Sequence, residues 1–272
     1  MQEKKNLLLG IVQGRLSNSP KNRLQFFPKN YENEFKLAKQ IGFDFIEFFS
    51  ERRLNNNNPI WKSKIKKNYL HLSKKNNLKL YTFCDDYIIS NSILDLKTQN
   101  YIKKLIYKIN KLKIKNLILP MYGKSMMTDL NYKKFVNEFI KILNYDKKIN
   151  IFLESNISPS TFNFFKTMVK SKRIKFLFDT GNRSTLKRDL YEDILSFNKN
   201  IGHIHIKDKD SKKTNVMLGK GNVDFYKLFK ILKKINYKSN FTLETTRGDY
   251  FKRSAEKNFK YIKKLIIKYL IK

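Results

Sequence analysis

IGHIHIKDKD, residues 201–210, contains two of the three histidines in the chain. Ile204 and Ile206 alternate with His203 and His205, which is the period-two pattern of a β-strand with two different faces. Side chains two residues apart on a strand point to the same side, so both imidazoles can enter one cavity. The residues alone leave two interpretations open: a functional pair, or core histidines that make ordinary hydrogen bonds.

Short apolar runs typical of strands recur along the chain, and segments with helical apolar spacing separate them. Residues 102–112 and 251–270 each carry an apolar stripe at helical spacing. Tyr31–Gln40 and Asp224–Lys234 are shorter segments of the same kind, and Ser158 followed by proline is a typical helix start. The eight predicted strands are Leu7–Val12, Phe43–Phe49, Lys79–Cys84, Asn116–Met121, Asn150–Glu154, Ile174–Asp179, Gly202–Ile206 and Asn240–Glu244. Eight strand–helix units predict an α/β fold, a (β/α)8 TIM barrel.

The length and continuity of the sequence predict a single domain. A chain of 272 residues can bury a full core, and α/β barrels of this length usually form one domain. No Pro/Gly/Ser-rich linker interrupts the chain, and Asn55–Asn58 before Pro59 predicts only a loop. We therefore expect one TIM-barrel domain over residues 1–272.

The sequence also predicts a cytoplasmic protein. No apolar run approaches the roughly 20 residues that span a bilayer, and Leu7–Val12 is too short for the core of a signal peptide. The single cysteine, Cys84, rules out an intrachain disulfide and fits a reducing compartment. Its place in a predicted strand favours a core role over a nucleophilic one.

The chain is strongly basic, with 58 Lys and Arg against 23 Asp and Glu and a net charge of +35. Such a charge raises the question of a nucleic acid or an anionic membrane as a partner. The lysines are spread along the chain, mostly on polar faces of predicted helices, as at Lys103, Lys104 and Lys108. We therefore expect solvated lysine surfaces, no nucleic-acid or membrane partner, and attraction of anionic small molecules.

Polar side chains are concentrated where the predicted strands end. The active site of such a barrel is built from the carboxyl ends of the strands, so these side chains are expected to converge. Each of them taken alone is explained as well by a helix cap or a surface group. The residues are Arg15, Glu47, Asp86, Glu154, Asn156, Asp179, Asn182, His203, His205, Lys207, Glu244 and Arg247.

Three carboxylates and one imidazole within this set predict a metal site. Glu154, Asp179 and Glu244 would repel one another at the mouth of a barrel, and a divalent cation relieves that repulsion. His205 adds a nitrogen ligand, and this mixture without thiolate suits Mn²⁺, Mg²⁺, Co²⁺ or Zn²⁺ without choosing among them. We expect one divalent metal ion.

Positively charged residues at the same strand ends predict an anionic ligand, such as a phosphate or a carboxylate. Arg15, Lys207 and Arg247 are suited to bind it, with an ordinary surface cation as the alternative for the lysine. The GKGN segment at residues 219–222 predicts a tight loop near a ligand, although it lacks a nucleotide-binding fingerprint.

The sequence resembles the xylose-isomerase-like TIM-barrel superfamily, and more narrowly its sugar-phosphate isomerase/epimerase type. The segments that carry the resemblance are GIVQGRLS, GFDFIEFF, FLESN, FLFDTGN, GHIHIKD, LGKGNVDF and FTLETTRG. They cover nearly the whole chain, in register with the eight predicted strands.

The resemblance implies residue roles and a reaction. It implies metal ligation by Glu154, Asp179, His205 and Glu244. In the ketose 3-epimerases of the superfamily the two glutamates also form the acid–base pair, so Glu154 and Glu244 would remove and return a proton beside a carbonyl. The implied function is a metal-dependent isomerase or epimerase that acts through an enediolate on a sugar or sugar derivative. We expect a sugar or sugar phosphate as ligand, and a monomer or homodimer.

Two departures from the epimerase pattern concern the substrate. Ser211 stands where those epimerases carry an arginine, and Asn182 stands where they carry a histidine, so the resemblance does not extend to a free-ketose 3-epimerase. The residues expected to contact the substrate are Arg15, Glu47, Asp86, Asn156, Asn182, His203, Lys207 and Arg247.

Three other functions stay open at this point. A dehydratase of a keto-sugar or cyclitol would use the same metal site. An AP-endonuclease-like barrel would use the basic surface. That branch needs several more histidines at its metal site, and only His203 and His205 are available here, because His71 lies on a predicted helix. A barrel that binds sugar without turning it over is the third.

Overall fold

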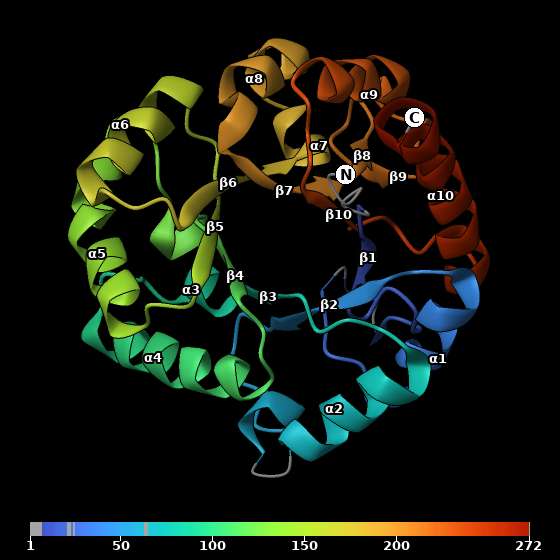
Figure 1. Ribbon diagram of the computed structural model, residues 1–272, viewed down its shortest axis with the longest axis horizontal. Coiled ribbons are helices and arrows are strands. Elements are labelled where there is room, and N and C mark those ends of the chain that lie inside the picture. Colours follow the sequence, from blue (N-terminus) through green and yellow to red (C-terminus); the bar gives the residue numbers. More distant parts are fainter. Residues whose placement is uncertain (1–6, 21–22, 24, 63–64, 272) are drawn as a thin grey trace, which may run out of the picture. The chain divides into compact units, whose positions relative to one another are not determined.

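The structure is a computed structural model that describes residues 7–20, 23, 25–62 and 65–271. Figure 1 labels its elements. The strands are β1 (Leu9–Val12), β2 (Phe45–Ser50), β3 (Thr82–Asp85), β4 (Asn116–Pro120), β5 (Asn150–Glu154), β6 (Ile174–Asp179), β7 (Ile201–Ile206), β8 (Asp208–Lys209), β9 (Asn215–Val216) and β10 (Asn240–Leu243). The α-helices are α1 (Tyr31–Ile41), α2 (Ile65–Asn76), α3 (Tyr87–Ser90), α4 (Leu96–Lys111), α5 (Val136–Tyr145), α6 (Pro159–Val169), α7 (Thr180–Arg183), α8 (Leu190–Phe197), α9 (Phe225–Lys234) and α10 (Phe251–Ile266).

Eight strands of the described residues form a closed barrel in the order β1–β10–β7–β6–β5–β4–β3–β2. The pairs β1–β10, β10–β7, β2–β3, β3–β4, β4–β5 and β5–β6 are all parallel. The short strands β8 and β9 form a separate antiparallel pair. Helices lie between successive barrel strands along the chain. The predicted (β/α)8 TIM barrel is therefore confirmed.

Strand positions are confirmed, and strand starts are the main difference from the prediction. β5 and β6 have the predicted bounds, whereas β1 begins at Leu9 and β3 at Thr82. Leu7 and Leu8 are buried although they precede the strand. A buried segment leading into a strand has the same apolar composition as the strand itself, so composition alone does not locate the first paired residue.

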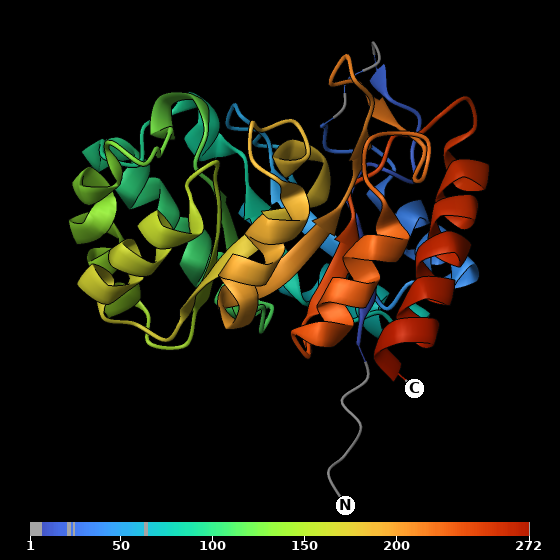
Figure 2. The same cartoon turned by 90° about the horizontal axis from the view of Figure 1, so that it is seen from above.

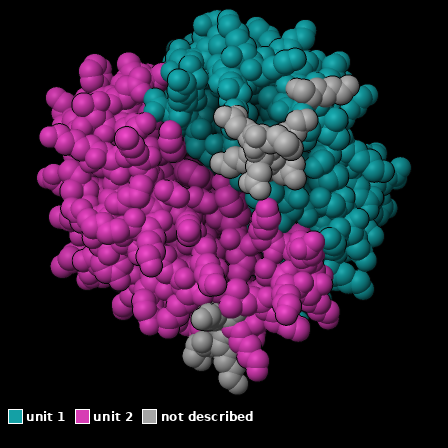
Figure 3. All heavy atoms as spheres, in the orientation of Figure 1, with its two compact units in different colours: residues 1–46, 178–272 teal, residues 47–177 magenta. Residues whose placement is uncertain are grey.

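Residue contacts divide the chain into two compact units. Unit 1 contains residues 1–46 and 178–272, and unit 2 contains residues 47–177 (Figure 3). One domain over residues 1–272 stays a prediction, and residues 1–6 and 272 at its ends lie outside the described residues.

In unit 1, strand register places both histidines of β7 on the side away from the helices. Thr242 of β10 pairs with His205, and Gly10 of β1 pairs with Thr242. Phe241, the residue before Thr242 in β10, points the other way and stacks on Phe229 of α9 with ring centroids 5.6 Å apart. Alternation therefore directs Thr242 and the histidines away from α9. Figures 1 and 2 show α9 and α10 side by side on the outer side of these strands.

The absence of a side chain at Gly10 makes room for an aromatic ring. A Cβ atom at this position would overlap the ring of Phe45, which is fully buried. The same ring lies 6.3 Å from the imidazole of His203. Gly10 thus lets a large apolar group fill the space beside His203.

Unit 2 has a core of aromatic rings between its strands and helices. The rings of Phe139 (α5) and Phe165 (α6) meet edge to face at 5.1 Å, and Phe162 packs on Phe176 of β6 at 5.3 Å. Helix α6 begins as predicted, because the Ser158 hydroxyl accepts a hydrogen bond from Thr161 N at 3.2 Å. Cys84 is buried in β3, as expected of a core residue.

Across residues 7–20, 23, 25–62 and 65–271, no helix has both the length and the apolar character needed to cross a membrane.

Replacing Gly10 with alanine should lower the free energy of unfolding by about 1–3 kcal/mol, because the new methyl group overpacks the Phe45 ring. Urea denaturation of the wild type and Gly10→Ala checks this. In a Phe45→Leu background the same change should cost at least about 1 kcal/mol less. Equal costs in both backgrounds would show that the ring is not what Gly10 accommodates.

Candidate functional site

Two carboxylates, an imidazole and an ammonium group meet at the carboxyl ends of β6, β7 and β10 in unit 1. Lys207 Nζ lies 2.8 Å from Asp179 Oδ2 and 2.8 Å from Glu244 Oε2. His205 Nδ1 lies 3.2 Å from the same Glu244 oxygen. All four residues are buried. This grouping brings together four of the predicted site residues.

Local contacts fix the path of Lys207 into this cluster. The Thr180 hydroxyl donates to Lys207 O at 2.6 Å and accepts from Lys207 N at 2.9 Å. A Cβ atom on Gly181 would lie 2.7 Å from Lys207 Cγ, so only glycine lets the lysine side chain pass. Asp179 caps α7, because its Oδ1 accepts from Asn182 N at 2.7 Å.

Glu244 contacts more of the positively charged side chains than Asp179 does. Its Oε1 accepts from Arg15 Nη2 at 3.3 Å and from Gln25 Nε2 at 2.8 Å. Burial alone would raise the pKa of Glu244, but Lys207, His205 and Arg15 together lower it well below its ordinary value. Glu244 is therefore ionised at neutral pH.

His203 lies deeper in unit 1 than His205. One ring nitrogen, Nε2, shares a hydrogen bond of 2.7 Å with the Thr242 hydroxyl. Burial, with His205 as a second cause, lowers the pKa of His203 well below its ordinary value, so the ring is neutral. A substrate contact by His203 stays a prediction.

A buried glutamate of α1 holds the turn that presents Arg15. Glu34 Oε2 accepts from Gly14 N at 2.8 Å, and Oε1 accepts from Leu16 N at 3.0 Å and from the Ser17 hydroxyl at 2.8 Å. Gly14 has φ +84°, and a Cβ atom there would lie 2.6 Å from Phe26 O. Burial raises the pKa of Glu34 to about 7 despite these hydrogen bonds.

Arg247 binds backbone oxygens of the same region. Its Nε and Nη2 donate to Gly14 O at 2.9 and 2.6 Å, and Nη1 donates to Arg23 O at 3.1 Å. The guanidinium lies over the Phe26 ring at 4.8 Å. Burial is the main reason that the pKa of Arg247 falls to about 9. The predicted substrate contact of Arg247 stays a prediction beside this structural role.

The GKGN segment encloses an aspartate. Asp208 Oδ2 accepts from Gly219 N and Gly221 N, each at 2.9 Å, and Oδ1 accepts from Val223 N at 3.1 Å. Gly221 has no room for a Cβ atom against Asp208. The glycines therefore allow backbone amides to approach a carboxylate of the chain itself. On the exit of β7, Lys209 Nζ donates to Asn182 Oδ1 at 2.9 Å.

The other predicted site residues belong to unit 2. Glu154 ends β5, and its Oε1 accepts from the Tyr122 hydroxyl at 3.1 Å. Glu47 is buried in β2 and accepts from the Thr82 hydroxyl at 2.9 Å. Asp86 is buried just before α3, and Asn156 is exposed after β5. Their roles as fourth ligand, base or substrate contacts stay predictions.

Two glutamines are not among the predicted site residues. Gln25, from the segment between β1 and α1, donates to Glu244. Gln13 follows β1 directly and is 1% exposed, and neither end of its amide has a hydrogen-bond partner within the described residues. Gln13 had a usable signal, since it is the first polar residue after a predicted strand. Gln25 had none, because its segment has no regular structure.

The donor atoms of Asp179, His205 and Glu244 fit a divalent cation. One atom from each residue lies within 4.8 Å of one atom from each of the others. Two buried carboxylates and an imidazole are oxygen and nitrogen ligands suited to Mn²⁺, Mg²⁺, Co²⁺ or Zn²⁺. The Lys207 ammonium between the carboxylates shows that this place attracts positive charge.

Comparison with protein families identifies the barrel. The sequence profile of the xylose isomerase-like TIM barrels matches residues 35–265. The chain belongs to this xylose isomerase-like family. No curated protein matches the sequence.

Solved structures share the fold over almost the whole chain. D-psicose 3-epimerase from Clostridium cellulolyticum H10 superposes with a TM-score of 0.76 at 12% identity, covering 96% of this chain and 99% of that one. 3-Keto-D-glucoside 4-epimerase from E. coli gives 0.69 at 17%, covering 95% and 100%. The IolI protein with a bound zinc atom gives 0.71 at 15%, covering 97% and 98%. At these identities the likeness establishes the xylose isomerase-like fold.

The raised pKa of Glu34 predicts a pH dependence of stability. A folded-state pKa of about 7, against an ordinary 4.5, means that the folded protein holds this proton more tightly than the unfolded chain. Stability should therefore fall by about 3 kcal/mol as pH rises from about 4.5 to 7, and this loss should be absent in Glu34→Gln. Unfolding free energies across this range check it, and parallel pH profiles would contradict it.

The position of Lys207 predicts competition with a metal ion. Replacing Lys207 with glutamine removes the ammonium group from Asp179 and Glu244, so Mn²⁺ should bind at least about tenfold more tightly, a gain of 1.4 kcal/mol. Isothermal titration calorimetry measures this.

Lys209→Gln is the matched control, because the Lys209 ammonium donates to Asn182. The Lys209→Gln variant should bind Mn²⁺ with the affinity of the wild type. Equal or weaker binding by Lys207→Gln would show that the ammonium does not compete for this site.

Proposed function

We propose that this protein is a metal-dependent isomerase or epimerase of a sugar or sugar derivative, with an anionic substrate favoured. The observation that carries the proposal is the meeting of Asp179, His205 and Glu244 around a positive charge at the strand ends. Asp179, His205 and Glu244 would hold the metal ion, with Glu154 as the fourth ligand. When bound, a divalent cation would supply Lewis-acid stabilisation for negative charge that develops beside a substrate carbonyl.

The charges of the site support proton-transfer chemistry. A proton beside a sugar carbonyl is very weakly acidic, so its removal needs an ionised base and nearby positive charge. The lowered pKa of Glu244 keeps its carboxylate ionised, so this carboxylate is available to take the proton from the substrate. Glu154 is the proposed partner that returns a proton to the other face, and the Tyr122 hydroxyl orients it.

Two cationic side chains beside Glu244 favour an anionic substrate. Arg15 Nη2 and Lys207 Nζ each contact this carboxylate, from the ends of β1 and β7. Their positive charges favour a phosphate or carboxylate on the substrate as well as the negative charge that develops as the proton leaves.

The comparisons support a sugar as substrate. D-psicose 3-epimerase and 3-keto-D-glucoside 4-epimerase share the fold and, by their names, invert a sugar centre. The IolI protein carries zinc, which supports a metal ion in this fold. A cytoplasmic location and a monomeric or homodimeric state stay predictions.

Solvent-proton exchange tests the proposal. A panel of sugars, sugar phosphates and nucleotide sugars is incubated with Mn²⁺-loaded protein in D₂O, and loss of a substrate proton is followed by NMR. Exchange should require metal and fall by about 10²–10⁴-fold in Glu154→Gln and in Glu244→Gln.

Glu138→Gln is the control, because Glu138 is also largely buried but pairs with Lys141 on α5. It should exchange like the wild type. Full exchange in both site variants would rule out the two-glutamate mechanism, and exchange without metal would rule out the metal-dependent one.

A further inference from the structure

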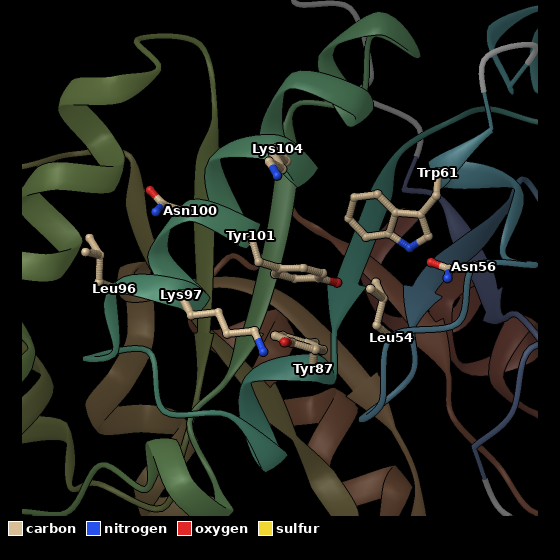
Figure 4. Close-up of a pocket in the computed structure, with 9 residues that line it drawn as sticks. All are labelled: Leu54, Asn56, Trp61, Tyr87, Leu96, Lys97, Asn100, Tyr101 and Lys104. Atoms are coloured by element: carbon tan, nitrogen blue, oxygen red, sulfur yellow. The ribbon is translucent and has the colours of Figure 1, made fainter.

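A cavity lies in unit 2, and none of the residues that line it has been assigned a role above. Its volume is about 660 Å³, within the ~300–1,000 Å³ typical of small-molecule sites. The loop after β2, the start of α3 and one face of α4 enclose it (Figure 4). It is lined by Leu54, Asn56, Trp61, Tyr87, Leu96, Lys97, Asn100, Tyr101 and Lys104.

Three aromatic rings form one wall of this pocket. Tyr87 and Tyr101 stack with centroids 4.0 Å apart and an interplanar angle of 23°, and Trp61 lies 5.2 Å from Tyr101. Leu54 and Leu96, which are 53% and 71% exposed, add apolar surface at the rim. Tyr87 and Tyr101 are buried and Trp61 is half-buried, so mainly Trp61 is open to a flat ring that packs by its face.

Hydrogen bonds hold these rings in place without a ligand. The Tyr101 hydroxyl donates to Asp85 Oδ1 at 3.1 Å, and Ser50 also bonds to Asp85. Trp61 ends a short 3₁₀ helix, Pro59–Trp61, and its carbonyl accepts from Lys108 Nζ at 3.4 Å. A rigid wall lowers the entropy lost when a ligand binds.

Helix α4, which also carries Tyr101, places two positive charges at the pocket, one turn before and one turn after this ring (Figure 4). Lys97, Asn100 and Lys104 follow the i, i+3, i+7 spacing of one helix face, so the two lysine Cα atoms are about 10 Å apart. No acidic residue lines the pocket, and within the described residues neither lysine forms an ion pair. The Asn100 amide between them offers both a donor and an acceptor.

We propose that this pocket binds a nucleotide. The base would lie against Trp61 and the tyrosine pair, and the phosphates would lie at Lys97 and Lys104. A neutral sugar would leave both lysines without a counter-charge, and a bare phosphate would leave the aromatic wall exposed to water. A nucleotide is the common biological ligand that combines a flat ring with negatively charged groups.

Trp61 is the single tryptophan of the chain, so its fluorescence reports directly on this pocket. UDP and ADP are titrated into the full-length protein at 150 mM salt, with uridine and pyrophosphate as the two halves of the ligand. A nucleotide diphosphate should change the emission saturably and bind at least about tenfold more tightly than either half, since each half lacks one set of contacts.

Charge variants separate the pocket from the general basic surface. Lys97→Gln/Lys104→Gln should weaken UDP binding by roughly tenfold or more, as expected for lost charge-assisted hydrogen bonds. Lys103→Gln/Lys111→Gln removes the same charge from the same helix, where the ammonium groups lie over Tyr145 and Tyr107. This control should bind UDP like the wild type.

Three outcomes would overturn the proposal. They are no saturable response to UDP or ADP, equal losses in the two double variants, and tighter binding of a single-stranded oligonucleotide that neither variant weakens. Equal affinity for UDP and a UDP-linked sugar would support the site and would show that it also accepts a nucleotide that carries a sugar. Binding of UDP alone supports it as a site for the free nucleotide.

Discussion

The ion cluster of Asp179, Lys207, Glu244 and Arg15 is the constraint on which the organisation of unit 1 depends. Ionised groups removed from water are stable only where opposite charges and hydrogen bonds compensate for lost hydration. Here two carboxylates face two cations, and all four are buried. The contacts around the cluster hold these four side chains together, because loss of any one of them would leave a buried charge without an opposite charge beside it. The same concentration of charge is the basis on which we propose a metal ion and proton transfer at these strand ends.

Carboxylates that accept backbone amides form the next layer of support. Glu34 holds the turn that carries Arg15, and Asp208 holds the loop at residues 219–223. Asp85 has a related role in unit 2, where it accepts side-chain hydroxyls and fixes Tyr101. Glu34 and Asp208 thereby replace the regular hydrogen bonding that irregular segments lack. The turn that carries Arg15 and the loop at residues 219–223 are therefore ordered by the chain's own carboxylates.

The sequence was sufficient to predict the barrel. It also predicted that Asp179, His205 and Glu244 lie close together, because polar residues at the carboxyl ends of parallel strands share one edge of the sheet. It was insufficient for Gln25, which reaches Glu244 from an irregular segment. Lys207 was expected to contact substrate, and its bridge between two carboxylates depends on a side-chain path beside Gly181 that no local pattern encodes. The loop at residues 219–222 was predicted to be tight, but the group it encloses, Asp208, lies eleven residues before its first glycine.

The amide cage around Asp208 has a consequence for ligand binding. Loops beside active sites often order only when a ligand arrives, and the lost conformational entropy then weakens the affinity. Three backbone N–H groups at residues 219, 221 and 223 are already directed at one carboxylate in this chain. The entropy of this loop is lost during folding. Any ligand that meets the β7 exit therefore encounters a surface of fixed shape, and its selectivity would come from fit to that surface instead of from closure around it.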